Sequence, residues 1–304
     1  MTQIDVSDKA FNEDFYPKIF HNLDRESKHA QKVFFCLIFL QSVLLITVPV
    51  FILLSTLYSW EGVAVFIPLF VLLGLLIILF VSPRDSWVVK WQLLRTGAET
   101  IKRQCWLYFM RCDPYIAQDQ PQKDRLLLIQ TIKDTLDSLR KRSIVINGHH
   151  DDRFYVSALT EQNRSENVES RLEFYINHRL RDQITWYQKK SKANKTSANM
   201  YNRLLAGVLV FTLIFGTLIA FTHRSLLESL DILIAVMLSM QSFNNAKRFA
   251  DLSVTYQNTY LDLQAILEGV GSDSVGDPCS IVRVVEDTIS RENEMWHIKR
   301  VNAS

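Results

Sequence analysis

The chain has 304 residues, with 34 Lys and Arg against 32 Asp and Glu, and a mean hydropathy of +0.04. This charge balance excludes a global field that would point to nucleic acid or to an acidic partner. The averages hide a segregated chain, because four apolar stretches contain almost none of the charged residues. We expect no cleavable signal peptide, since the chain is polar and of mixed charge up to Val33.

The apolar stretches predict an all-α membrane protein with four transmembrane helices in two hairpins, joined to long cytoplasmic amphipathic helices. They cover about residues 33–56, 63–81, 204–222 and 226–243. The first three carry no charge and are at least 19 residues long. At 1.5 Å per residue such a helix is about 28 Å or longer, enough to cross the hydrocarbon core of a bilayer.

Three polar side chains in or beside the spans are candidate pore or intramembrane residues. Gln41 lies in the first span, and Glu228 and Asp231 lie near the start of the fourth. Gln41 either hydrogen-bonds between helices or lines a lumen. Asp231 lies either within the bilayer, where an ionisable group indicates function, or at the level of the headgroups.

Basic residues around the spans predict the orientation. Lys and Arg precede the first span, follow the second, precede the third and follow the fourth. The first hairpin tip, residues 59–62, contains none of them, and the second, residues 223–225, contains one. By the positive-inside rule both tips face outside, and both termini and the middle of the chain lie in the cytoplasm.

The cysteines are consistent with that compartment. Cys36, Cys105, Cys112 and Cys279 include no CxxC pair. Cys105 and Cys112 are two helical turns apart, too far for a bridge within a straight helix. We therefore expect reduced thiols in a cytoplasmic setting.

Each hairpin belongs to a larger module of the same design. We place the first module at residues 11–115, a cytoplasmic connector at 116–170 and the second module at 171–298. In both modules a long helix leaves the hairpin and carries an apolar stripe with a period of 3.5 residues. The first stripe is Trp87, Trp91, Leu94, Ala98, Ile101, Cys105 and Tyr108. Such a stripe requires a partner helix, which belongs either to the same chain or to another protomer.

The connector carries weaker signals. Apolar residues at helical spacing predict a short amphipathic helix over 128–139, and residues 143–148 predict a brief strand that ends in a turn. The polar segment 161–170 predicts a mobile linker. Residues 149–152, His-His-Asp-Asp, have metal-ligand chemistry, but adjacent histidines in a loop seldom converge on one ion, so we interpret them as a solvated turn.

Two stretches resemble a known family. Residues 91–115, W-Q-L-L-R-T-G-A-E-T-I-K-R-Q-C-W-L-Y-F-M-R-C-D-P-Y, resemble the R-x-x-AE-x-IK-x-x-x-W-x-Y-x-M-R-x-x-P-[YF] signature after the hairpin of one SLATT subfamily. Residues 179–194, R-L-R-D-Q-I-T-W-Y-Q-K-K-S-K-A-N, resemble the RL-x-DQ-x-x-WY-x-x-KA-x-x-N helix that enters the membrane in a second subfamily. Residues 286–296 resemble the end of that second module. The likeness covers roughly residues 11–298.

The resemblance implies two tandem two-helix membrane effector domains of bacterial conflict and antiviral defence systems, found beside nucleotide-sensing or nucleotide-generating partner proteins. It implies no catalytic residue, and the sequence shows no catalytic constellation, so we expect no enzyme, no cofactor and no nucleic-acid partner. We interpret the chain as a multi-pass inner-membrane effector that homo-oligomerises in the lipid bilayer and permeabilises it when triggered. The alternative is a membrane-anchored sensor or scaffold whose cytoplasmic helices bind a partner without pore activity.

Ten residues of the two signatures are candidate contacts of the cytoplasmic helices. They are Trp91, Arg95, Glu99, Lys102, Trp106, Arg179, Asp182, Gln183, Trp186 and Tyr187. Arg95, Glu99 and Lys102 are spaced for i,i+4 and i,i+3 ion pairs on one helix face. Two interpretations stay open for these charges, namely structural pairing within the fold and a regulatory contact.

Overall fold

The computed structural model describes residues 15–58, 66–81, 84–116, 120–142, 144, 154, 158–222, 229–270 and 277–301. Throughout these residues the regular secondary structure is helical, without strands. The strand predicted at 143–148 and the cluster at 149–152 fall outside them, apart from Ile144. The chain divides into two compact units. We call residues 1–30, 89–189 and 255–304 the polar unit, and residues 31–88 and 190–254 the apolar unit.

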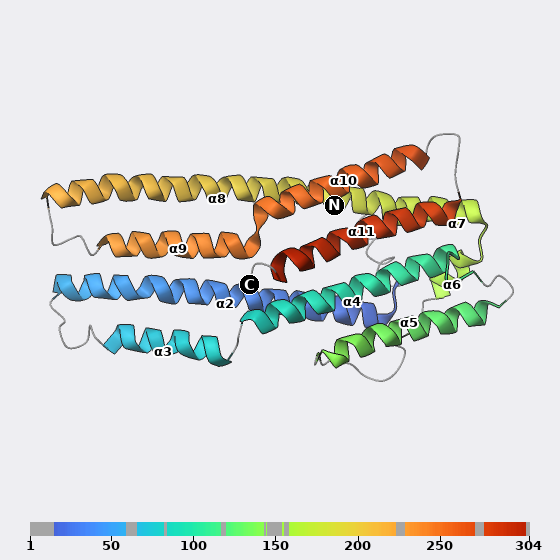
Figure 1. Cartoon of the computed structure of the whole chain (residues 1–304), viewed down its shortest axis with the longest axis horizontal. Helices are drawn as coiled ribbons and strands as arrows, with labels where there is room; N and C mark the ends of the chain where they lie inside the picture. The colour runs from blue at the N-terminus through green and yellow to red at the C-terminus, as the bar shows by residue number, and fades with distance from the viewer. Residues whose placement is uncertain are drawn as a thin grey trace. The chain divides into compact units, whose positions relative to one another are not determined.

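The helices follow the labels of Figure 1. The first half of the chain contains α2 (Lys18–Tyr58), α3 (Phe66–Val81), α4 (Arg84–Met110) and α5 (Pro121–Lys141). The second half contains α6 (Ala158–Arg164), α7 (Val168–Tyr175), a π-helical turn (Ile176–Leu180), α8 (Arg181–Thr222), α9 (Ser229–Lys247), α10 (Phe249–Val270) and α11 (Pro278–Val301). The described parts of the four predicted spans therefore lie in helices α2, α3, α8 and α9.

Three helices of the polar unit begin where the sequence supplies a suitable start. Pro121 opens α5, where the missing N–H of proline would have had no helical partner. Asn167 caps α7, because its Oδ1 accepts a hydrogen bond from the backbone N–H of Ser170 at 2.8 Å. Asp277 caps α11 in the same way and accepts from the N–H of Ser280 at 3.2 Å. These local sequence signals set the residue at which each of the three helices begins.

From Trp91 onward the stripe predicted on α4 is buried in the core of the polar unit, each of these members being at most 4% exposed, whereas its first member, Trp87, is half-buried. It packs within its own chain, since the Ser27 hydroxyl of α2 donates to the Trp91 carbonyl at 3.3 Å. The amphipathic helix predicted in the connector is α5, which buries Leu128, Ile132, Leu136 and Leu139. Helices α4 and α5 approach closely at Gly97, where an added Cβ would lie 2.9 Å from Leu139 Cδ1.

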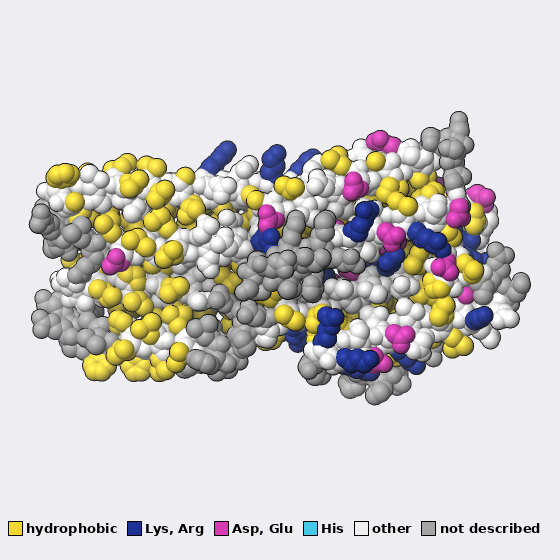
Figure 2. Space-filling view, viewed as in Figure 1, with side chains coloured by type: hydrophobic (Ala, Val, Ile, Leu, Met, Phe, Trp, Pro, Cys, Tyr) yellow, Lys and Arg dark blue, Asp and Glu magenta, His cyan; other side chains and the backbone are white. Residues whose placement is uncertain are grey.

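The apolar unit carries its apolar side chains outward, as Figure 2 shows for one face. The most apolar 18-residue windows of Lys18–Tyr58 and Val168–Phe221 have mean hydropathies of 2.7 and 2.6, and only 6% of each is buried. A core helix of a soluble protein would bury such a window, so this surface is suited to lipid. Two of the four predicted spans are thus candidate membrane helices.

The other two predicted spans do not reach the same length and hydropathy within the described residues. Helix α3 is very apolar but has 16 residues there. Helix α9 has 19 residues, with Asp231 in its first turn and polar side chains near its end. These two helices nevertheless belong to the packed apolar unit. Helix α9 approaches α8 at Gly216, where an added Cβ would lie 3.3 Å from Leu230 Cδ2.

The expectation of reduced thiols is wrong for two of the four cysteines. Cys112 and Cys279 form a disulfide with their Cα atoms 5.3 Å apart, whereas Cys36 and Cys105 are free. The two partners are 167 residues apart in sequence, so no spacing rule pairs them. They meet because the start of α11 lies beside the end of α4, where Arg283 also pairs with Asp113 at 3.4 Å.

The expectation of a mobile linker at residues 161–170 is also wrong. This segment ends α6 and begins α7. The Glu161 carboxylate accepts a hydrogen bond from the Tyr108 hydroxyl at 2.7 Å. Arg164 is buried, and its Nη2 lies 2.5 Å from Oδ2 of Asp124 in α5. Polar composition suggested a linker, but here the polar side chains form paired contacts inside the unit.

Candidate functional site

Three of the candidate contacts form a charged face of α4 inside the polar unit. Arg95, Glu99 and Lys102 follow one another at i, i+4 and i+7, and all three are half-buried. Groups from other helices act on them electrostatically. Tyr256 of α10 and Glu292 of α11 act on Arg95, and Arg179 of the π-helical turn and Glu286 of α11 act on Lys102. We call the charged layer the set Arg95, Glu99, Lys102, Arg179, Glu286 and Glu292.

Arg179 and Glu286 are two buried members of the layer, and they form a bidentate ion pair. Nε and Nη2 of Arg179 donate to Oε1 and Oε2 of Glu286 at 2.8 and 2.9 Å. The Tyr175 hydroxyl donates to the same Oε1 at 3.0 Å. Burial lowers the pKa of Arg179, but the Glu286 carboxylate more than offsets this and holds it well above its ordinary value. This pair links the π-helical turn before α8 to α11.

Arg179 of that pair contributes to the pKa shifts of Lys102 and Glu99 on α4. Burial lowers the pKa of Lys102, and the positive charge of Arg179 lowers it further, beyond what Glu99 restores. Burial raises the pKa of Glu99, but Lys102 and Arg95 hold it below its ordinary value. The layer contains three cationic side chains and three carboxylates, so its charges balance when all are ionised.

Glu292 is the carboxylate of the layer with the weakest support. It is 1% exposed, and its Oε2 accepts a hydrogen bond from the Tyr187 hydroxyl at 3.2 Å. Its Oε1 is buried and has no hydrogen-bond partner among the described residues. Burial raises the pKa of Glu292, and the attraction of Arg95 only partly lowers it. Glu292 therefore takes up a proton more readily than an ordinary glutamate does.

Aromatic side chains pack against the layer. Trp106 is fully buried, and its Nε1–H donates to the Tyr16 hydroxyl at 2.8 Å. The Trp106 ring lies 4.4 Å from Phe15 and 5.4 Å from Tyr175, between ring centroids. Tyr16 also lies under Lys102, whose Nζ is 5.6 Å from the ring centroid. These contacts exclude water, and burial consequently raises the pKa of Tyr16 far above its ordinary value.

Four of the predicted contact residues are not members of the charged layer. Trp91 belongs to the buried stripe of α4. Trp186 packs on α10, with its ring 5.4 Å from that of Tyr256. Asp182 is exposed and Gln183 is half-buried, and the Gln183 amide donates to the Asp182 carboxylate at 3.3 Å. The two signatures therefore mark both the charged layer and ordinary packing positions.

Sequence reasoning did not single out Glu286, Glu292, Tyr16 or Tyr175. A signal existed for the two carboxylates, because residues 286–296 resemble the end of a known module. The partners of Arg95 were instead sought on neighbouring turns of its own helix, where ion pairs are common but weak, and those of Arg179 were sought on the neighbouring exit helix. The buried partners come from more than 100 residues away, as the separation of 107 between Arg179 and Glu286 illustrates.

The two candidate pore residues that the structure describes lie on different helices of the apolar unit. Gln41 is half-buried in α2, and Asp231 is exposed in the first turn of α9. Glu228 lies outside the described residues. A carboxylate in the first turn complements the positive end of the helix dipole, which is a sufficient structural role for Asp231.

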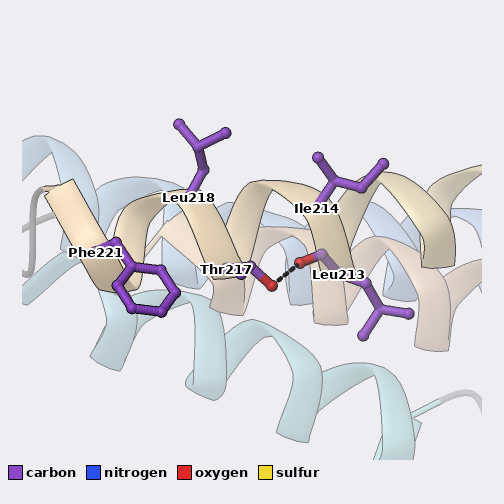
Figure 3. Close-up of a pocket in the computed structure, with 5 residues that line it drawn as sticks. All are labelled: Leu213, Ile214, Thr217, Leu218 and Phe221. Atoms are coloured by element: carbon purple, nitrogen blue, oxygen red, sulfur yellow. Dashed lines mark hydrogen bonds between the residues drawn. The ribbon is translucent and has the colours of Figure 1, made fainter.

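An apolar groove lies on α8 (Figure 3). It has a volume of about 530 Å³ and is lined by Leu213, Ile214, Thr217, Leu218 and Phe221. Its hydroxyl group is satisfied within the helix, because Thr217 donates to the Leu213 carbonyl at 2.7 Å. The groove therefore presents apolar surface without a free polar group, a surface suited to acyl chains or another apolar helix. Across the described residues no group of three His, Cys, Asp or Glu is placed to hold a metal ion.

Comparison with known proteins gives two adjacent family matches. Residues 17–172 match SMODS and SLOG-associating 2TM effector domain 3, and residues 175–296 match SMODS and SLOG-associating 2TM effector domain 1. A search of curated proteins and a search of solved structures returned no match. The first match extends through α5 and α6, so the polar segment after the first hairpin is part of that domain. The chain belongs to the SLATT family of two-transmembrane effector domains associated with conflict and defence systems, and it carries two different SLATT domains in tandem.

Proposed function

We propose that this protein is a multi-pass inner-membrane effector that homo-oligomerises and permeabilises the bilayer when its polar unit receives a trigger. The observation that carries the proposal is the exposure of the most apolar windows of α2 and α8, only 6% of which is buried. A surface of this length and hydropathy requires lipid or other apolar helices. The family description, a two-transmembrane effector domain present twice, supports the same conclusion.

The proposal includes four spans with both hairpin tips outside and the termini in the cytoplasm. The basic residues that flank the predicted spans support this orientation. A Cys36→Ser background removes the exposed free thiol. In that background a cysteine at Ser59, in the first tip, should react with an impermeant thiol reagent on intact cells. A cysteine at Ser165, an exposed residue of the polar unit, should stay unlabelled until the cells are opened. Labelling of Ser165→Cys in intact cells would contradict the orientation.

The charged layer gives the proposed effector a place to receive its trigger. It connects α4 of the first SLATT domain to the turn before α8 and to α11 of the second. A partner protein or ligand that separates Arg179 from Glu286 would leave a desolvated charge without its counter-charge, and this separated state is the second arrangement that the proposal requires. A nucleotide-sensing or nucleotide-generating protein is the partner class that the family description suggests.

Ion flux from purified protein in liposomes tests the proposal directly. We expect an entrapped ion to be released from vesicles that contain the protein at densities that allow oligomers. Because release requires oligomers, its rate should increase more than in proportion to the protein density. Vesicles with Leu213→Asp, which places a charge on the exposed face of α8, provide the matched control. Inserted, oligomeric wild-type protein without flux would favour the alternative, a membrane-anchored sensor or scaffold.

The acidic residues near the fourth span test the nature of the pathway. In an open oligomer Asp231 and Glu228 would form a ring near the outer mouth and attract cations. Glu228→Gln with Asp231→Asn should then reduce cation preference without preventing assembly, as measured by reversal potential under a salt gradient. Identical selectivity in both proteins would remove these residues from the permeation path.

A further inference from the structure

Three arginines gather at the end of the polar unit where α4, α6 and α7 meet. We call Arg111, Arg164 and Arg171 the arginine cluster. The Tyr108 carbonyl accepts hydrogen bonds from the backbone N–H of Arg111 at 3.2 Å and from Nε of Arg164 at 2.9 Å. The Arg164 carbonyl in turn lies 3.5 Å from Nη1 of Arg171. These links come from different helices, so the fold rather than local sequence brings the three together.

The positive charge of Arg164 is compensated by contacts within the polar unit. Its guanidinium lies 2.5 Å from the Asp124 carboxylate and 4.2 Å from the Tyr108 ring centroid, and the ion pair is buried. Asp124 therefore compensates one of the three positive charges. Asp113, the acid nearest to Arg111 in sequence, is paired with Arg283 at 3.4 Å.

Within the described residues Arg171 and Arg111 have no carboxylate partner. Arg171 is 5% exposed, and its hydrogen bond to the Arg164 carbonyl is at the limit of that interaction. Nε of Arg171 and Nε of Arg111 are both buried and have no hydrogen-bond partner within the described residues. Burial lowers the pKa of Arg171 to about 10, and the positive charges of Arg111 and Arg164 contribute. Arg111 is half-buried as a residue, whereas Arg171 is a buried charge, which is costly unless an anion compensates it.

The backbone at Arg111 points to the same conclusion. Arg111 ends α4 in the left-handed conformation, with φ at 55°, a position that glycine or asparagine usually occupies. The bonds from Arg111 N–H to Tyr108 O and from Cys112 N–H to Leu107 O complete this helix end. Its positive charge also complements the negative end of the α4 dipole, but that interaction does not use the buried Nε donor of its guanidinium.

We infer that the arginine cluster is a binding site for a phosphate group of a soluble small molecule. Guanidinium groups donate paired hydrogen bonds to phosphate oxygens, and a phosphate dianion would compensate both uncompensated charges, whereas a carboxylate would compensate one. Phospholipid headgroups share this chemistry. However, Arg111 lies about 40 Å along α4 from Arg84, the end that follows the predicted second span, which favours a soluble source. The inference does not depend on pore formation.

Binding of inorganic pyrophosphate to the full chain in non-ionic detergent and phosphate-free chloride buffer tests this site. Titration calorimetry should show saturable binding, and pyrophosphate should raise the thermal midpoint above that in chloride of equal ionic strength. Arg171→Gln should weaken binding by about ten-fold or more and raise the ligand-free midpoint, because it relieves repulsion. Arg111→Asn, which keeps a residue suited to the left-handed conformation, should also weaken binding.

The control is Arg140→Gln, which removes an exposed arginine paired with Asp137 at 3.0 Å and should bind as wild type does. Equal affinity in Arg171→Gln, Arg111→Asn and Arg140→Gln would overturn the inference, as would the absence of saturable binding to wild type. A ligand-free midpoint that falls in both cluster variants, with no loss of affinity, would assign the cluster a structural role instead. Stabilisation by nanodiscs that contain phosphatidic acid, but not by pyrophosphate, would show that the bound phosphate belongs to a lipid headgroup and would contradict a soluble ligand.

Discussion

The two units of this chain treat charge and apolar surface in opposite ways. In the polar unit Arg179 is 1% exposed and is compensated by a carboxylate that is equally buried. In the apolar unit Phe221 is 87% exposed, in a groove lined by other exposed apolar residues of α8. Both arrangements are unfavourable unless other groups compensate them. A buried charge loses its hydration, and an apolar ring that is exposed to water is not stabilised by hydration. For Arg179 the polar unit compensates this cost internally, whereas the apolar unit requires a different solvent.

The largest effect should come from breaking the buried ion pair. Arg179→Met leaves Glu286 desolvated without a cation and should cost about 3–5 kcal/mol of folding free energy. Arg179→Met with Glu286→Leu removes both charges and should recover most of that loss. Thermal unfolding of the purified proteins measures both. If the double variant is as unstable as the single one, the layer has a role in packing that charge pairing does not explain.

The second test compares two leucines with similar exposure in different units. Leu213 on α8 is 63% exposed and Leu126 on α5 is 67% exposed. Leu126→Asp should change stability by about 0.5 kcal/mol or less, as for most changes on a wet surface. Leu213→Asp should cost about 3 kcal/mol if that face lies in the bilayer. The fraction of protein that stays in alkali-washed membranes reports the difference, and equal retention of the two variants would place Leu213 in water.

The third test uses the opposite pKa shifts of two carboxylates in the layer. The pKa of Glu292 is raised by burial, so its contribution to stability is present below the ordinary value of 4.5 and is lost as pH rises through the raised value. The pKa of Glu99 is lowered, so its contribution is present above 4.5 and is lost as pH falls through the lowered value. Thermal midpoints of wild type relative to Glu292→Gln should therefore fall as pH rises from about 4.5. The thermal midpoint of wild type relative to that of Glu99→Gln should instead fall as the pH drops below about 4.5. If both midpoint differences change in the same direction with pH, the opposite pKa shifts of Glu292 and Glu99 are wrong.

The smallest effect concerns two glycines. Gly97→Ala in the polar unit places a Cβ 2.9 Å from Leu139 Cδ1, and should destabilise by about 1 kcal/mol because that leucine can shift only at a cost. Gly207→Ala on α8 meets nothing within 4 Å and should be neutral or slightly stabilising, since alanine favours the helix. Unfolding midpoints of the two variants give the comparison. A loss at Gly207 would indicate that another chain covers that face.

The sequence predicted the helices better than it predicted what holds them together. The 3.5-residue stripe on α4 and the apolar face of α5 follow from local spacing, and both are buried as predicted. Arg95, Glu99, Lys102 and Arg179 were singled out because they belong to two recognisable signatures. Their buried partners, Glu286 and Glu292, could not be assigned from spacing, since only folding brings α11 to α4. The π-helical turn that carries Arg179 departs from the 3.6-residue period, so periodicity could not predict it.

The bond between Cys112 and Cys279 closes the chain into a covalent ring that contains both helices of the second hairpin. A single backbone cut at any position between these cysteines opens the ring without separating the molecule into two pieces. The two SLATT domains would consequently remain in equal numbers in any assembly, even after proteolysis of the segment that joins them. Reduction of one bond would end this linkage, because the two pieces would then be held by packing alone.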